Sequence, residues 1–240
     1  MRRKAIAVLL SCLALAACSG GGEEGEGAVE LGAADQAKAA AMLAEYQAAR
    51  TAGNPQAAEA AADKLREKYP DSSAAHELDA TLDDVRKAAE AQREGARLRK
   101  LWDYQANDVG KGVQRTATIF SKVPDLGEDA PAAAPDAQLV LRDHPEWGRS
   151  AYLLLAQSKF ACGKPCTLQL AFDAEAPAEW RGKQADSGHG PALFIEDEAR
   201  FITALRAAKQ LRVLLPKGSG SIGSLVFEVG GFSPERYASP

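Results

Sequence analysis

The sequence has few of the side chains that hold metals, with three histidines and four cysteines in 240 residues. His76, His144 and His189 lie far apart and show no zinc-finger spacing. An excess of positive charge is also lacking, because 29 basic residues face 33 acidic ones and the formal net charge is −4. We therefore expect no cofactor, and no general electrostatic attraction to nucleic acid or anionic lipid.

The chain also lacks an apolar run long enough to span a membrane. Its most apolar run, residues 5–17, is shorter than the roughly 20 residues that a spanning helix needs. Arg2, Arg3 and Lys4 precede this run, and no acidic residue appears before Glu23. A basic start followed by a short apolar core is typical of a secretory signal peptide, so residues 1–17 are predicted to be removed.

The end of this leader, Leu15-Ala16-Ala17-Cys18, resembles the lipobox of bacterial lipoproteins. The resemblance implies cleavage before Cys18 and attachment of acyl chains to this cysteine and its new amino group. It also implies an outer-membrane location, because the family's sorting rule associates Asp after the cysteine with the inner membrane, and Ser19 stands there. The alternative is an ordinary secreted protein in which a cysteine falls at this place by chance. In either case residues 18–33, rich in Gly and Glu, are predicted to form a flexible tether.

Two cysteines remain in the mature chain, Cys162 and Cys166, on either side of a Gly-Lys-Pro turn sequence. In an exported protein such a pair is predicted to form a structural disulfide. A redox-active pair and a metal site are the alternatives. The former usually has two intervening residues, and the latter would need two more ligands.

Residues 34–100 are predicted to be helical, because they consist mainly of Ala, Glu, Leu, Lys, Arg and Gln. Asp35 is a candidate cap for the first helix. The turn signal at residues 51–54 precedes Pro55, which suits the first position of a second helix. Residues 70–73 end that helix and offer caps for a long third one.

The first two helices, ending in Lys68-Tyr69-Pro70-Asp71-Ser72-Ser73-Ala74-Ala75, resemble a tetratricopeptide hairpin over residues 39–75. Only one such unit is present, whereas a solenoid needs about three to be stable. We therefore expect one hairpin packed on the third helix rather than a peptide-binding groove. A coiled-coil arm is the competing interpretation.

Residues 101–240 are predicted to form a β-rich domain. The expected strands lie around residues 102–104, 112–122, 138–142, 150–158, 167–173, 193–195, 211–215 and 224–229. The strands at 150–158 and 167–173 are expected to form a hairpin stapled by the disulfide, followed by a polar loop over residues 175–191. One late helix is expected at residues 197–210. The predicted fold class is thus α+β, with N-terminal helices and a mainly antiparallel β-sandwich or partly closed barrel.

This second half resembles a family of uncharacterised domains from exported bacterial and prophage proteins. The pattern lies at residues 102–104, 139–148, 160–162, 166–173, 193–195 and 227–232, with Phe201, Leu205 and Ala208. The resemblance implies a fold and no particular chemistry.

No catalytic set is evident in the sequence. Asp143 and His144 are adjacent on a predicted strand, so they would point to opposite faces and cannot form a triad with Ser150. The Gly-Ser segment at residues 218–221 lacks the ending of a phosphate-binding loop. Trp147 and Trp180 lie beside predicted loops and are candidate binding side chains, although ordinary core packing is the alternative for both.

We therefore predict a non-enzymatic, membrane-anchored envelope lipoprotein that faces the periplasm and binds or scaffolds another envelope component. The oligomeric state is open. One alternative is a passive structural or protective surface protein without a specific partner. Another is a hydrolase with a site in the loop that contains His189.

Overall fold

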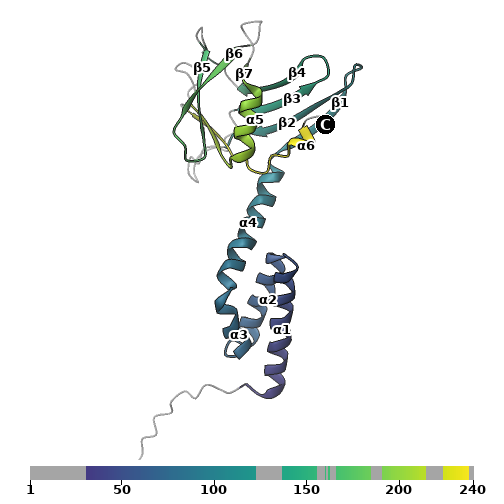
Figure 1. The fold of residues 1–240 in the computed structure, drawn as a ribbon, viewed down its shortest axis with the longest axis vertical. Coiled ribbons are helices and arrows are strands. Elements are labelled where there is room, and N and C mark those ends of the chain that lie inside the picture. Colours follow the sequence, from purple (N-terminus) through teal and green to yellow (C-terminus); the bar gives the residue numbers. More distant parts are fainter. Residues whose placement is uncertain are drawn as a thin grey trace, which may run out of the picture.

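The molecule consists of a helical stalk and a β-rich head, so the predicted α+β class is confirmed (Figure 1). The computed structural model describes residues 31–122, 137–155, 160, 162, 166–184, 191–214 and 224–237. None of the helices in this part of the chain is long and apolar enough to cross a membrane.

The stalk begins with the predicted helical hairpin, α1 (Ala33–Thr51) and α2 (Pro55–Lys68). Pro55 occupies the first turn of α2, and the side chain of Asn54 accepts a hydrogen bond of 3.1 Å from the backbone N–H of Ala57. The prediction that Asp35 caps α1 is wrong. Gly32 holds the cap position, and Asp35 lies within the first turn of the helix, where it accepts a hydrogen bond from Lys38.

The predicted long third helix is interrupted. Ser72 caps the short helix α3 (Ser73–Glu77), a 3-10 turn (Leu78–Ala80) follows, and α4 (Leu82–Lys100) then runs into the head. The Tyr46 hydroxyl lies 2.7 Å from the Thr81 hydroxyl at this interruption, which joins α1 to the start of α4. α2 packs between α1 and α4 around a core that is rich in alanine. Small side chains allow helix backbones to approach closely, so these alanines suit a thin bundle.

The head is one antiparallel sheet of nine strands, which curls around its core. The strands are β1 (Asp103–Asp108), β2 (Val113–Phe120), β3 (Ala137–His144), β4 (Gly148–Leu155), β5 (Cys166–Phe172), β6 (Ala178–Gln184), β7 (Ala192–Ile195), β8 (Leu211–Leu214) and β9 (Ser224–Phe227). Their order across the sheet is β1-β2-β3-β4-β7-β6-β5-β8-β9.

Two predictions about these strands are wrong. β4 and β5 do not form a hairpin, because β4 pairs with β3 and β7 whereas β5 pairs with β6 and β8. The predicted polar loop at residues 175–191 contains β6. In β6 only Trp180 and Gly182 alternate towards the core, and the remaining residues are polar or small, so the strand pattern is faint in the sequence.

The two edges of the curled sheet approach each other, so the sheet is partly closed, as predicted. Just beyond β2, the backbone N–H of Lys122 donates a hydrogen bond of 2.6 Å to the carbonyl oxygen of Val226 in β9. Helix α5 (Glu198–Ala207), capped by Asp197, lies on the concave side, where Phe201 and Leu205 are buried. The alternate residues Ala137, Leu139 and Leu141 of β3, and their counterparts on the other strands, complete this core. We call this side of the sheet the inner face and the opposite side the outer face.

Candidate functional site

Trp147 is the most exposed large apolar residue among those that the structure describes, at 68%. It lies in the tight turn between β3 and β4, directly before Gly148, whose positive φ of 69° favours glycine. The indole ring stacks on the imidazole of His144, with ring centroids 3.9 Å apart and an interplanar angle of 11°. A large aromatic surface is thus held open to solvent at a fixed place.

The side chain of His144 stabilises this turn through hydrogen bonds. The imidazole is buried, and its Nδ1 accepts hydrogen bonds from the backbone N–H groups of Glu146 at 3.1 Å and Trp147 at 3.4 Å. The tautomer that accepts at Nδ1 carries its proton on Nε2. His144 therefore organises the turn that presents Trp147.

A second hairpin braces the first. The turn between β1 and β2 carries Val109 and Lys111, and Lys111 forms an ion pair with Glu146. Gly112 lies against Pro145, whose Cβ would be only 3.0 Å from a Cβ added at the glycine. The tips of the two hairpins therefore contact each other, although a single exposed ion pair contributes less than about 1 kcal/mol.

Arg142 lies next to Trp147 on the outer face. Its guanidinium carbon is 5.3 Å from the ring centroid of Trp147 and 5.6 Å from that of Tyr152. These distances fit cation–π contacts. Tyr152 in turn lies 5.1 Å, centroid to centroid, from Phe194 on β7. Burial raises the pKa of the Tyr152 phenol above its ordinary value, although the nearby positive charge of Arg142 opposes this rise.

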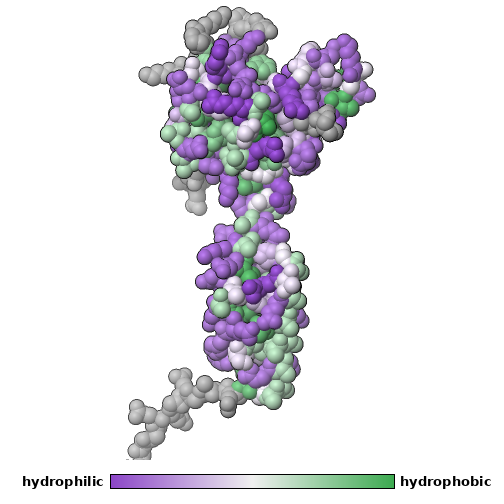
Figure 2. Space-filling model, in the orientation of Figure 1, coloured by the Kyte–Doolittle hydropathy of each residue, from purple (hydrophilic) through white to green (hydrophobic). Residues whose placement is uncertain are grey.

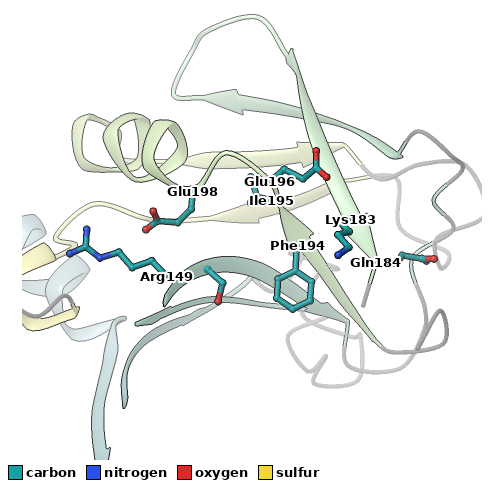
Figure 3. Close-up of a pocket in the computed structure, with 8 residues that line it drawn as sticks. Arg149, Lys183, Gln184, Phe194, Ile195, Glu196 and Glu198 are labelled. Atoms are coloured by element: carbon teal, nitrogen blue, oxygen red, sulfur yellow. The ribbon is translucent and has the colours of Figure 1, made fainter. Parts of the chain in front are cut away.

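The outer face continues into a cleft of about 650 Å³ where β7 ends and the chain turns towards α5. The residues that line it are Arg149, Ser150, Lys183, Gln184, Phe194, Ile195, Glu196 and Glu198. Figure 3 shows Arg149 and Glu198 at one end of the cleft, and Phe194 and Lys183 side by side nearer the other. The cleft therefore mixes one aromatic ring with charges of both signs.

The other candidate tryptophan, Trp180, is buried. It lies on the inner face of β6, with the rings of Phe172 and Phe201 each 6.0 Å away and the guanidinium of Arg200 stacked at 3.9 Å. Of the two interpretations that the sequence left open for Trp180, ordinary core packing is the one that the structure shows, because Trp180 faces the core from β6. The alternation of Trp180 with Gly182 was the signal that could have identified it.

Cys162 and Cys166 are joined by a disulfide, with Cα atoms 5.1 Å apart. The predicted disulfide between these two cysteines is thus present. Cys166 begins β5, and its sulfur lies against Gly182 of β6, so the bridge fastens the start of β5 and does not staple a hairpin of β4 with β5.

Several other sites named from the sequence lie outside the described residues, namely Cys18, His189 and the Gly-Ser segment at 218–221. Within the described part of the chain, no group of three or more His, Cys, Asp or Glu side chains is placed to hold a metal ion. On the face drawn in Figure 2, the head is mostly hydrophilic and its apolar patches are small and separate.

No protein-family model matches the sequence, and no curated protein matches it either. One solved structure is similar, the crystal structure of invasion associated protein B from Bartonella henselae. The identity is 19% and the TM-score is 0.37, over 56% of this chain and 87% of that one. This likeness is too distant to carry an argument about the head.

Proposed function

We propose that this chain is a non-enzymatic lipoprotein of the bacterial cell envelope, and that its head binds another envelope component. In this proposal Cys18 carries the lipid in the outer membrane, and the mature protein faces the periplasm. The leader and the lipobox-like Leu15-Ala16-Ala17-Cys18 support the anchor. The two or more acyl chains that the resemblance implies are enough for stable attachment.

The stalk supports this arrangement. α1 begins at the end of the stalk that is remote from the head (Figure 1). α4 has 19 residues and alone covers about 28 Å at 1.5 Å per residue. An anchor before α1 would therefore hold the head well away from the membrane surface.

The exposed ring of Trp147 is the observation that carries the binding role. An indole that is 68% exposed, yet held by His144 and Arg142, loses little conformational freedom when a partner covers it. Tryptophan is among the residues that most often contribute strongly to binding.

The anchor is tested by intact mass and membrane fractionation of the wild type beside Cys18→Ala. We expect the wild type to carry about three acyl chains and to sediment with the outer membrane, while the variant is soluble. An unlipidated, soluble wild type would overturn the anchor.

The binding role is tested in cells by placing a photoreactive residue at position 147 in the full-length protein. A matched probe at position 120 serves as the control, because Phe120 is also well exposed, at 53%, on the outer face. We expect an adduct with an envelope component from position 147 and none from position 120. No adduct from either position would favour the passive surface protein.

A further inference from the structure

The register of β2, β3 and β4 places a short row of polar side chains on the outer face. Arg142 lies directly opposite Thr116 on one side and Ser150 on the other. Directly opposed residues on neighbouring strands share a face, with Cβ atoms about 5 Å apart. The side chain of Arg142 therefore leaves the sheet between two short hydroxyl side chains.

The neighbouring row of side chains on the outer face contains two aromatic residues and a lysine. Tyr152 lies opposite Phe194, and Phe194 lies opposite Lys183. With Trp147 and Arg142 these three residues form a band that we call the outer strip. In it aromatic rings are flanked by basic groups. The strip crosses from β3 to β6, a width of about 15 Å at the usual spacing of neighbouring strands.

The polar row contains atoms whose hydrogen bonding is incomplete. Arg142 Nε and Ser150 Oγ are both buried and lack a hydrogen-bond partner among the residues that the structure describes. Such atoms are rare in folded proteins, and here they belong to directly paired residues. In the same part of the chain no carboxylate forms an ion pair with Arg142, whose charge meets only the rings of Trp147 and Tyr152.

We propose that the outer strip binds a glycan chain that carries carboxylate groups. Flat aromatic faces stack on the apolar C–H faces of sugar rings, so Trp147 and Phe194 would each hold one ring. Arg142 would pair with a carboxylate, because a guanidinium matches that group in shape and charge.

This inference rests on the proposed function and names its ligand class. An extended chain of several sugars fits a strip that crosses several strands, and outer faces of partly open β-barrels can serve as such platforms.

The test uses tryptophan fluorescence of the full-length protein in mild detergent. Trp102 and Trp180 are buried whereas Trp147 is exposed, so a ligand that covers the strip changes mainly the Trp147 signal. The probes are an oligomer of uronic acids, a neutral oligosaccharide of the same length, and a polyglutamate peptide of similar charge.

We expect the uronic acid oligomer to shift the emission to the blue, and the neutral oligosaccharide to bind at least tenfold more weakly. Calorimetry then compares variants without relying on Trp147 emission. Trp147→Ala, Phe194→Leu and Arg142→Gln should each weaken binding at least tenfold. Phe120→Ala is the matched control on the same face and should bind like the wild type.

Three outcomes would overturn the glycan assignment: no response to any sugar, equal binding of polyglutamate, or equal loss in Phe120→Ala. The crosslinking experiment at positions 147 and 120 tests the proposed binding function independently of the glycan assignment. An adduct between position 147 and an envelope protein, without glycan binding, would retain the proposed function and reject the ligand class.

Discussion

The indole Nε1 of Trp102 donates a hydrogen bond of 3.2 Å to the carbonyl oxygen of Val229, 127 residues further along the chain. Trp102 directly follows the last turn of α4, and Val229 follows β9. Both residues are buried. Close by, Arg97 of α4 forms an ion pair of 2.7 Å with Glu228. The stalk is therefore joined to the final strand of the head by specific contacts, in addition to the covalent chain.

Trp102→Phe should lower the free energy of unfolding by about 1–3 kcal/mol, because the buried Val229 carbonyl loses its donor while most of the ring is kept. Chemical denaturation followed by circular dichroism measures the change. Trp147→Phe is the matched control and should leave stability within about 0.5 kcal/mol, since Trp147 is largely exposed. Equal effects of the two substitutions would contradict the importance of this hydrogen bond.

Gly231→Ala should destabilise the junction between stalk and head. Gly231 has a φ of 79°, and an added Cβ would lie 2.7 Å from the backbone nitrogen of Arg99. The left-handed conformation costs about 1 kcal/mol, and overpacking against backbone adds about 1–3 kcal/mol. Thermal unfolding measures the loss.

Gly53→Ala separates these two costs. Gly53 has a similar φ of 67°, but nothing lies within 4 Å of its added Cβ. This control should show only the conformational cost. If it lost as much stability as Gly231→Ala, the close approach to Arg99 would not be the cause.

Reduction of the disulfide should lower the stability of the head by about 2 kcal/mol, the value expected from chain entropy for so short a loop. Denaturation with and without a thiol reductant measures this difference. The double variant Cys162→Ser/Cys166→Ser should start at the lower stability and should not respond to the reductant. Identical curves for oxidised and reduced wild type would show that the bridge contributes nothing.

Tyr237 should make the protein less stable at alkaline pH. Burial, reinforced by the negative charge of Glu198, raises the pKa of this phenol well above its ordinary value near 10. Above that pH the unfolded state releases the proton and the native state keeps it. Stability is therefore full below the unfolded pKa and falls as pH rises, by up to about 1.4 kcal/mol per pH unit for one group.

Urea denaturation from about two pH units below to about one unit above the ordinary phenol pKa (about pH 8 to pH 11) tests this expectation. Tyr237→Phe should flatten the alkaline part of the profile. Some slope should remain, because burial also raises the pKa values of Tyr104 and Tyr152. An unchanged slope in the variant would contradict a role for Tyr237.

The helices of the stalk were predictable because their signals are local. Pro55 and Ser72 mark helix starts through their own backbone geometry and capping atoms. The interruption before Leu82 was missed. The sequence there remains helical in composition, whereas Thr81 is held by a hydroxyl contact to Tyr46, 35 residues away.

The two candidate tryptophans show why site residues were harder to predict. Both stand in polar surroundings in the sequence, yet Trp147 is exposed and Trp180 is buried. The difference arises because Trp180 lies on a strand and faces inward, whereas Trp147 lies in a turn. Composition near a residue does not reveal which face of a sheet it occupies.

The sequence by itself determined the positions of most helices and strands, the cysteine pair and the α+β class, because propensity, alternation and turn chemistry act over a few residues. Only the tertiary structure decided which strands are neighbours. In the folded sheet β7 and β6 lie between β4 and β5, and this order places Phe194 beside Tyr152 and Lys183. Strand pairing joins residues far apart in the chain, and its register depends on burial of the whole inner face, so no local pattern specifies it.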